Sequence, residues 1–217
     1  ALPLACAGRQ LALLLAGLWP GALTAGWEVV AVPGLIPEEA FFALLAQRRF
    51  PVTSWIRKPE EFDYVVEPDV FHDLFGHVPL LFNPMFADYM QAYGAGGLKA
   101  SRLEACETLA RLYWYTVEFG LIDTPAGLRA YGAGILSSAG ELRHSVTSSV
   151  PQRIGFDLER IMRTRYRIDS YQSTYFVVDS FDQLFEATAP DFTPIYRRVA
   201  AAGELDADAR LPTDRLF

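Results

Sequence analysis

Residues 69–79, with the sequence DVFHDLFGHVP, hold two of the three histidines in a chain of 217 residues. His72 and His77 are spaced H-x4-H, which turns about 500° on a continuous α-helix and leaves the side chains about 140° apart. Gly76 can adopt a positive φ and end the helix, so that His77 comes back toward His72 from the following turn. The two imidazoles are therefore expected either to share a metal ion or to be hydrogen-bonded structural histidines. The HExxH motif of zinc proteases is absent.

The strongest candidate for a third metal ligand is Glu118, near the end of the apolar stretch LYWYTVEFG at 112–120. Burying a carboxylate there is costly unless it has a partner; otherwise Glu118 lies at the surface with its apolar neighbours on other sides. Two histidines without cysteine suit iron, copper, nickel or zinc, and an added carboxylate gives the facial triad of non-haem Fe(II) oxygenases. Trp114, four residues before Glu118, is expected to form an aromatic wall beside the site.

The hydrophobic fraction of 51% is ample for a buried core, and the length is typical of about one domain. Ser101 and Glu104 match a capping box that opens a long helix. We expect a single, mainly α domain with minor β content (α+β) over 27–200, preceded by an atypical apolar segment over 1–26. A polar, loosely held C-terminal tail is expected over 201–217. Apolar periodicity and turn residues predict strands at 27–32 and 175–178, and helices at 37–47, 69–75, 83–94, 101–120, 125–131, 156–164 and from 180 onward.

Charge and cysteine content limit the partners and the compartment. The net charge of −7 argues against a nucleic-acid-binding surface, which needs clustered Lys and Arg. Cys6 and Cys106 cannot form a disulfide framework, so we expect a cytoplasmic protein. The apolar run at 11–19 is shorter than the roughly 20 residues that span a bilayer, so no membrane partner is expected. For residues 1–26, a secretory signal, a helix of the domain and a segment that binds a partner are alternatives.

Several motifs occur in an order that resembles a known family. The motifs are WEVVAVPGL, RRFPVTSWIR, DVFHDLFGHVPLLFNPMFADYMQAYG, LARLYWYTVEFGL, YGAGILSSAGEL and TRYRIDSYQSTYFVVDSF. Together they resemble the catalytic domain of the pterin-dependent aromatic amino acid hydroxylases, and most of all its single-domain bacterial members that act on phenylalanine. The resemblance covers residues 27–196.

The resemblance implies roles for individual residues. His72, His77 and Glu118 match the iron ligands of the family, and Asp69 matches the carboxylate that orients the first histidine, although it can also cap the helix. Arg57 matches the group that binds the substrate carboxylate, for which the guanidinium fork is well suited. The residues that match the pterin site are Gly34, Leu35, Ile36, Phe41, Asp73, Ala110 and Tyr113. The residues that match the amino-acid pocket are Arg57, Tyr64, Pro68, Trp114, Gly134 and Ser137.

Some of these positions have simpler explanations or depart from the family. Phe41 could be a core residue of an apolar helix stripe, and Tyr113 a buried tyrosine with a satisfied hydroxyl. Ser137 matches a residue that reaches either the first histidine or the substrate carboxylate. Glu38 and Pro51 replace polar residues that contact the pterin in animal members.

By resemblance, the chain is expected to be a monooxygenase that hydroxylates L-phenylalanine at ring carbon 4 to L-tyrosine. Its expected cofactors are Fe(II) and a tetrahydropterin, its substrates are L-phenylalanine and O2, and it is expected to be a monomer. The alternatives are tryptophan or tyrosine hydroxylation on the same scaffold, or an impaired iron-binding member because of the unusual residues 1–26.

Overall fold

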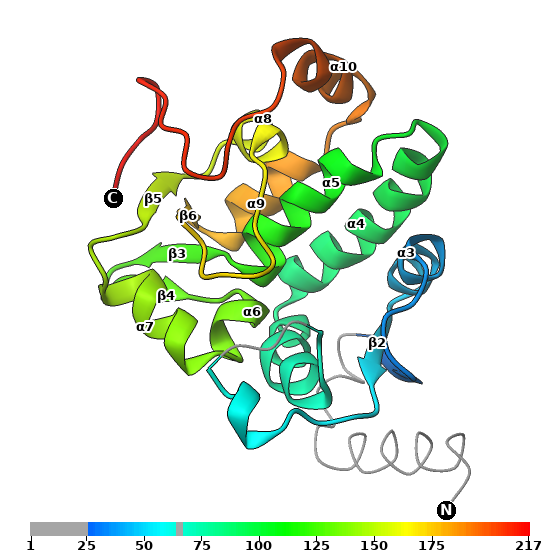
Figure 1. The fold of residues 1–217 in the computed structure, drawn as a ribbon. Coiled ribbons are helices and arrows are strands. Elements are labelled where there is room, and N and C mark those ends of the chain that lie inside the picture. The colour runs from blue at the N-terminus through cyan, green and yellow to red at the C-terminus, as the bar shows by residue number, and fades with distance from the viewer. Residues whose placement is uncertain (1–25, 64–66) are drawn as a thin grey trace, which may run out of the picture.

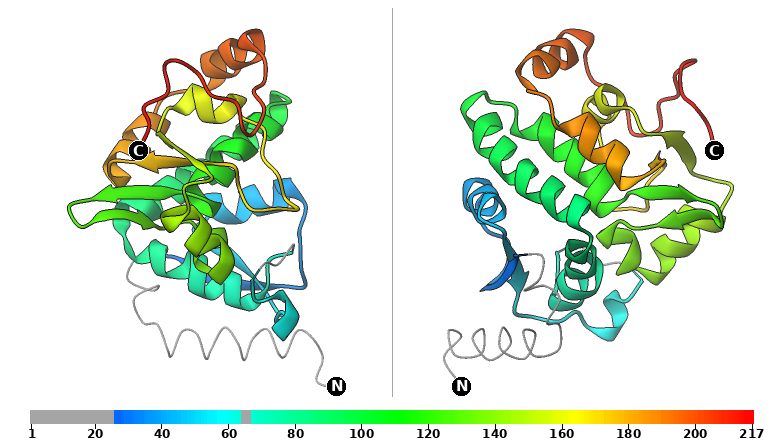
Figure 2. Two further views of the ribbon diagram at one scale, coloured as in Figure 1. Left: turned by 60° about the vertical axis from the view of Figure 1, so that its left-hand side comes forward. Right: turned by 180° about the vertical axis from the view of Figure 1, so that it is seen from behind.

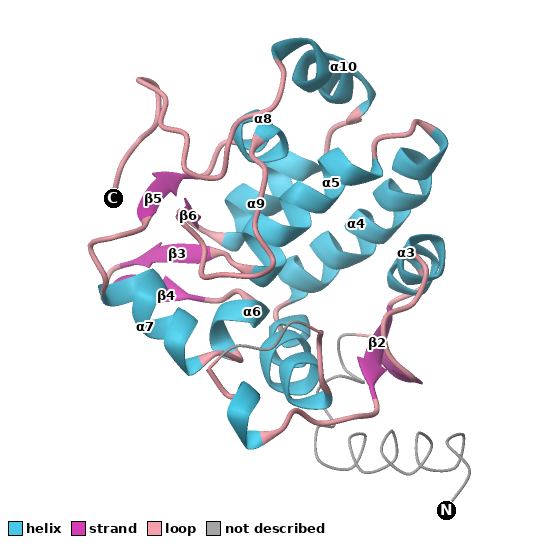
Figure 3. Cartoon of the chain, viewed as in Figure 1, coloured by secondary structure: helices cyan, strands magenta, loops and turns pink. Residues whose placement is uncertain are grey.

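The computed structural model describes residues 26–63 and 67–217, and helices dominate this part of the chain (Figures 1 and 3). Its α-helices are α3 (Glu38–Ala46), α4 (Pro84–Arg102), α5 (Cys106–Tyr113), α6 (Ala133–Leu136), α7 (Ala139–Thr147), α8 (Leu158–Arg163), α9 (Phe181–Thr188) and α10 (Thr193–Ala202). Shorter 3-10 or π-helical turns are η1 (Pro59–Glu61), η2 (His72–His77), η3 (Val78–Phe82) and η4 (Trp114–Glu118). The strands are β1 (Glu28–Val32), β2 (Arg49–Thr53), β3 (Leu121–Thr124), β4 (Gly127–Ala130), β5 (Gln152–Gly155) and β6 (Thr174–Val178). The expected mainly α architecture with minor β content is confirmed.

The strands form two small sheets on either side of the long helix α4 (Figures 1 and 2). Strands β1 and β2 pair in parallel, with Val30 opposite Pro51. The second sheet has the order β4-β3-β6-β5, in which only the β3–β4 pair is antiparallel. Strand β6 is buried along its whole length, as expected for a central strand with both faces covered.

Helix α4 begins where the sequence predicts but continues past Gly94. The side chain of Asn83 accepts hydrogen bonds from the main-chain N–H groups of Met85 and Phe86, which caps the helix. Gly94 does not end the helix: a Cβ there would lie 2.4 Å from the main-chain nitrogen of Ala46, so this glycine permits the close approach of α3. The helix continues through Gly94 and ends at Arg102.

The capping box predicted at Ser101 and Glu104 is wrong. Ser101 lies in the last turn of α4, and Glu104 lies in the connection to α5 with a φ of +54°. Helix α5 instead begins at Cys106 after Ala105, which offers no side-chain cap. The pattern S-x-x-E marks a helix start only when the serine itself lies outside the helix.

The helix predicted at 125–131 is also wrong, because these residues form the turn and second strand of the β3–β4 hairpin. Gly127 has a φ of +92°, a conformation that glycine adopts without strain. The hydroxyl of Thr124 donates a 2.6 Å hydrogen bond to the carbonyl of Gly127 and closes the turn.

The C-terminal residues are packed rather than loosely held. The carboxylate of Asp214 accepts a 3.0 Å hydrogen bond from Nε of Arg160, and both side chains are almost fully buried. The main-chain N–H of Gly155 donates to the carbonyl of Arg215 at 2.7 Å. A buried guanidinium needs a counter-charge, and the tail supplies it.

The expectations for the apolar N-terminal segment fall on residues 1–25, which lie outside the described residues. Within 26–63 and 67–217, no helix is both long and apolar enough to cross a membrane.

Candidate active site

His72, His77 and Glu118 converge on one point. Nε2 of His72 lies 3.0 Å from Nε2 of His77, and these nitrogens lie 3.4 and 3.2 Å from the carboxylate oxygens of Glu118. All three ligand atoms lie within 4.8 Å of one another. Two ligand nitrogens at about 2.1 Å from an ion, at a right angle, are separated by about 3.0 Å, so this spacing suits a single metal ion. Two imidazoles and one carboxylate are the donor set of non-haem Fe(II) oxygenases.

The two histidines meet because the chain forms a π-helical turn, and the explanation based on a positive φ at Gly76 is wrong. Within 26–63 and 67–217, the only glycines with positive φ are Gly26, Gly127 and Gly203. The N–H of Val78 instead bonds to the carbonyl of Asp73, five residues earlier. In a π-helix each N–H bonds to the carbonyl five residues earlier, so side chains five residues apart lie on nearly the same face.

Glu118 is placed by a second turn of the same kind. The N–H of Phe119 donates to the carbonyl of Trp114 at 2.8 Å, again five residues earlier. Turn η4 thereby ends with Glu118 directed at the two imidazoles. Such wide turns are rare and frequently occur at functional sites.

Gly76 is required for close packing between η2 and α6. A Cβ at this position would lie 2.7 Å from the Cβ of Ala133 and 2.9 Å from its Cα. No normal contact is that short, so a larger residue would push the π-helical turn away from α6.

Burial and the charges of neighbouring groups shift the pKa values of the three side chains in different directions. Burial lowers the pKa of His72 to about 4, so its imidazole is neutral and keeps a lone pair for a metal. Burial would raise the pKa of Glu118, but the charges of His77 and His72 outweigh burial and lower it, so the carboxylate stays ionised. Despite burial, the negative charge of Glu118 raises the pKa of His77.

Asp69 and Ser137 share the task of positioning His72. Asp69 accepts a 2.9 Å hydrogen bond from the main-chain N–H of His72 rather than from its imidazole. The imidazole Nδ1 lies 2.9 Å from the hydroxyl of Ser137. When Nε2 faces a metal, Nδ1 carries the proton and donates to Ser137, which fixes the orientation of the ring.

Arg57 is completely buried and engaged. Its Nε and Nη2 donate to the two carboxylate oxygens of Asp69 at 3.0 and 2.8 Å, and its Nη1 donates to the carbonyl of Ser137 at 2.5 Å. Neither Arg57 nor Asp69 has any exposed side-chain surface. The fork expected for a substrate carboxylate is therefore also the counter-charge of Asp69, and burial opposes but does not overcome the effect of Arg57, which lowers the pKa of that carboxyl.

A cavity of about 260 Å³ opens beside the three ligands. Of the pterin-site residues predicted by resemblance, all but Ala110 line it. Phe41 and Tyr113 meet edge-to-face in its wall, with ring centroids 5.7 Å apart. The predicted residues that line the cavity are Gly34, Leu35, Ile36, Phe41, Asp73, Tyr113, Pro68, His72, His77 and Glu118.

Thr53 is a residue of this cavity that the sequence did not indicate. Its main-chain N–H and its hydroxyl donate to the same carboxylate oxygen of Asp73, at 2.7 and 2.8 Å. Thr53 comes from β2 and has no spacing relation to the histidines, so only the tertiary structure places it here.

Apart from Pro68, the described residues predicted for the amino-acid pocket do not line this cavity. Gly134 lies against the ring of Phe119, where a Cβ would be 2.8 Å from the ring carbon Cζ. Trp114 opens η4, four residues before Glu118. Tyr64 lies outside the described residues.

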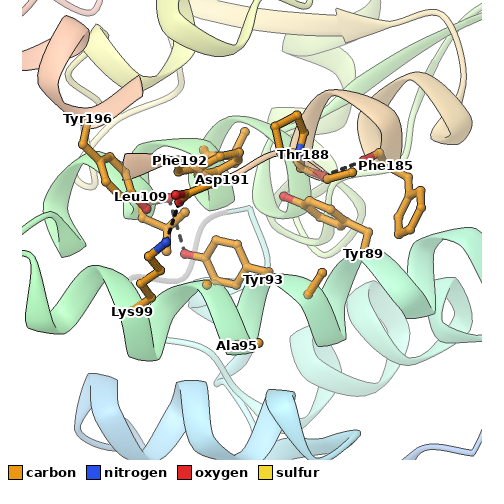
Figure 4. Close-up of a pocket in the computed structure, with 15 residues that line it drawn as sticks. Tyr89, Tyr93, Ala95, Lys99, Leu109, Phe185, Thr188, Asp191, Phe192 and Tyr196 are labelled. Carbon is orange, nitrogen blue, oxygen red and sulfur yellow. Dashed lines mark hydrogen bonds and ion pairs between the residues drawn. The ribbon is translucent and has the colours of Figure 1, made fainter. Parts of the chain in front are cut away.

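A second, larger cavity of about 570 Å³ lies apart from the metal ligands, between α4, α5, α9 and α10 (Figure 4). Tyr89 and Tyr93 line it, and an ion pair of 2.5 Å joins Lys99 to Asp191 on its wall. The cavity contains no residue predicted for iron, pterin or amino-acid binding. Cavity size alone therefore does not identify the candidate active site in this chain.

Comparisons with known proteins agree with the geometry. The sequence model of the family described as biopterin-dependent aromatic amino acid hydroxylase matches residues 22–198. The phenylalanine-4-hydroxylases of Ralstonia nicotianae and Chromobacterium violaceum are each 65% identical, over 192 and 189 residues. These alignments cover 86% and 87% of this chain but 61% and 64% of the relatives, so the chain spans less than two thirds of their length.

Solved structures show the same similarity. The iron- and phenylalanine-bound phenylalanine hydroxylase of C. violaceum matches with a TM-score of 0.86 at 62% identity, over 90% of this chain and 71% of that chain. Its cobalt-bound form matches with a TM-score of 0.88 at 63% identity, over the same shares. The matched sequence includes all three candidate metal ligands and the residues around them. The chain belongs to the biopterin-dependent aromatic amino acid hydroxylase family.

Proposed function

We propose that this chain is a tetrahydropterin-dependent phenylalanine 4-monooxygenase that holds Fe(II) through His72, His77 and Glu118. The observation that carries the proposal is the convergence of these ligands beside the cavity of about 260 Å³ lined by the predicted pterin-site residues. Phenylalanine-4-hydroxylases at 65% identity support the choice of substrate.

The protein supplies binding, orientation and exclusion of water, whereas the bound iron and tetrahydropterin supply the activation of dioxygen. His72 offers a neutral nitrogen, His77 would release its proton on binding the metal, and Glu118 offers one negative charge. Three protein ligands leave further positions on the metal open.

The aromatic walls and the charged groups divide the remaining tasks. Phe41 and Tyr113 offer flat apolar surface for the pterin ring, while Asp73 is fixed by Thr53 at the same cavity. Arg57 would offer the remaining N–H groups of its Nη1 and Nη2 to the amino-acid carboxylate, which requires this buried guanidinium to become accessible to the substrate. Trp114 provides an aromatic face for the side chain.

The decisive experiment is a product assay with the Fe(II)-loaded protein, a tetrahydropterin and oxygen, run in parallel on phenylalanine, tyrosine and tryptophan. Tyrosine from phenylalanine, at a higher kcat/KM than either other product, is the expected result. Preference for tryptophan or tyrosine would replace the substrate assignment. No product from any of them, with iron bound, would identify an impaired member.

The metal assignment has its own control. Glu118→Ala is expected to lose both iron and activity, because it removes the only anionic ligand of the cluster. Glu186→Ala, at an exposed position on α9, is the matched substitution and should retain both. Iron retained at full stoichiometry in Glu118→Ala would refute the role of Glu118 as a ligand.

We also propose that the enzyme is a cytoplasmic monomer acting on small molecules. All three metal ligands come from one chain and face one cavity, so no second copy is needed to complete the site. Within residues 26–63 and 67–217, Cys106 forms no disulfide, in keeping with a reducing compartment. Light scattering on the purified protein tests the monomer, and a stable dimer would overturn it.

A further inference from the structure

Trp114 is held in place by a glutamine from a distant part of the chain. The indole Nε1–H of Trp114 donates a 3.0 Å hydrogen bond to Oε1 of Gln172. Gln172 lies in the loop between α8 and β6, 58 residues away, and is only 2% exposed. A buried amide without partners would cost free energy, so its contacts define what it does.

The amide of Gln172 can make this bond in only one orientation. Its Nε2 donates to the carbonyl of Arg167 at 2.9 Å and lies 3.4 Å from the carbonyl of Ser170. Because carbonyl oxygens cannot donate, the nitrogen must face them and the oxygen must face the indole. The main-chain carbonyls of the loop between α8 and β6 therefore orient Oε1 of Gln172 toward the indole N–H of Trp114.

Two side chains of α7 hold the main chain of Gln172 from both sides. Its N–H donates to the carboxylate of Glu141 at 3.0 Å, and its carbonyl lies 3.2 Å from Nε2 of His144. Glu141 is itself fully buried and accepts a second hydrogen bond from the hydroxyl of Tyr175. Glu141 and His144 are three residues apart and so lie on one face of the helix.

Two aromatic rings also pack against the indole, which stays partly exposed. Tyr166 stacks on Trp114 with ring centroids 4.3 Å apart and planes 15° apart, and Phe119 lies 4.7 Å away. Stacking limits the tilt of the indole, but a hydrogen bond is needed to fix its rotation within the stack. Trp114 is also the first residue of the turn that ends in Glu118.

We propose that Gln172 is a positioning residue for the amino-acid substrate: it fixes the indole of Trp114, and Glu141 with His144 fixes Gln172. The proposal rests on the proposed function in one respect, namely that Trp114 forms a wall of the phenylalanine pocket. It also gives His144, the one histidine outside the metal cluster, a specific contact.

The test uses Gln172→Leu, which has similar size but cannot accept a hydrogen bond. The first measurement is the indole ¹⁵N–¹H spectrum of the full chain, with the Trp114 signal assigned by its loss in Trp114→Phe. In Gln172→Leu this signal should move upfield and exchange faster with solvent. Gln91→Leu, on α4 and remote from every indole bond described, should leave the signal unchanged.

The second measurement is the dissociation constant of phenylalanine for the Co(II)-loaded protein. Losing a neutral hydrogen bond worth about 1 kcal/mol predicts roughly 3- to 10-fold weaker binding in Gln172→Leu with metal stoichiometry unchanged. In the Trp114→Phe background, which lacks the donor, Gln172→Leu should have no further effect. Additive losses would mean that Gln172 does not act through the indole, and would overturn the proposal.

A milder variant covers the case in which Gln172→Leu does not fold. His144→Leu removes one contact to the carbonyl of Gln172 and should shift the Trp114 signal in the same direction. An unchanged indole signal in every folded variant overturns the proposal. Wild-type protein that binds no phenylalanine overturns the proposed function instead, and the indole signal still reports whether Gln172 fixes Trp114.

Discussion

Ser137 links the first metal ligand to the buried arginine: its hydroxyl lies 2.9 Å from Nδ1 of His72, and its carbonyl accepts a 2.5 Å hydrogen bond from Arg57. The imidazole of His77 is instead oriented by packing between two aromatic rings. Its centroid lies 5.0 Å from that of Phe50 and 6.3 Å from that of Tyr113. One imidazole is thus fixed by a hydrogen bond and the other by aromatic contacts.

Removing the hydroxyl of Ser137 should weaken the metal site. Ser137→Ala leaves His72 without the partner that sets its tautomer, and losses of this kind typically cost about 10- to 100-fold in metal affinity. Titration with Fe(II) or Co(II) measures the effect. The control is Ser138→Ala, which removes the N-cap of α7 and should cost about 1 kcal/mol of stability with unchanged metal affinity. Wild-type metal affinity in Ser137→Ala would refute the orienting role.

Adding a methyl group at Gly76 should disturb both stability and metal binding. The new Cβ would lie 2.7 Å from Ala133, and relieving such overpacking costs about 1–3 kcal/mol. We expect Tm to fall by about 2–4 °C for each kcal/mol, and metal affinity to fall with it. A Cβ added at Gly96 in α4 would have no neighbouring heavy atom within 4 Å, so Gly96→Ala should instead stabilise the chain by about 0.5–1 kcal/mol. Equal Tm shifts in the two variants would contradict the packing role of Gly76.

Arg57→Lys tests two roles of this side chain: its pair with Asp69 and its proposed contact with the substrate carboxylate. Lysine cannot form the paired bonds to Asp69, so Tm should fall, and phenylalanine should bind about 10- to 100-fold more weakly while iron remains bound. Calorimetry and metal analysis measure both effects. Arg49→Lys, in an exposed 3.0 Å pair with Glu28, should change neither. A lower Tm with unchanged phenylalanine affinity would leave Arg57 only as the partner of Asp69.

The pair Arg160–Asp214 predicts how stability responds to acid. Burial alone would raise the pKa of Asp214, but the hydrogen bonds and charge of Arg160 and the N–H of Leu211 lower it below the ordinary value of 3.8. A carboxyl whose folded pKa is depressed contributes stability above its unfolded pKa, and loses it as the pH falls through the folded pKa. Wild type should therefore exceed Asp214→Asn in Tm at neutral pH, and the difference should shrink below about pH 4. A difference independent of pH would contradict this origin.

Features that depend on neighbours in sequence were predicted well. The helix starts predicted at 83 and 180 have a local origin, because the side chains of Asn83 and Ser180 each accept a hydrogen bond from a main-chain N–H two or three residues later. The capping box predicted at Ser101 and Glu104 failed because the preceding helix, α4, continues through Ser101 to Arg102. A local sequence pattern such as S-x-x-E does not show whether its residues begin a new helix or end the preceding one.

The sequence identified the three residues of the candidate metal cluster, but it did not predict the backbone geometry that brings them together. The sequence indicates that His72 and His77 belong together, but it does not indicate the π-helical turn that joins them or its close packing against α6. Thr53 and Gln172 come from a strand and a loop far along the chain, so neither has a periodic relation to the ligands. Side chains that support a site from distant segments are visible only in the folded chain.

The two π-helical turns make the metal centre sensitive to chain length as well as to side-chain chemistry. Each wide turn accommodates one more residue than an α-helical turn, and each residue of an α-helix advances about 100°. Inserting a single residue between His72 and His77 would place them six positions apart, about 600° on an α-helix, and would rotate one imidazole out of the cluster with every ligand still encoded. Among natural variants of this chain, single-residue insertions within 72–77 should therefore be as harmful as loss of a ligand, whereas insertions in exposed connections should be tolerated.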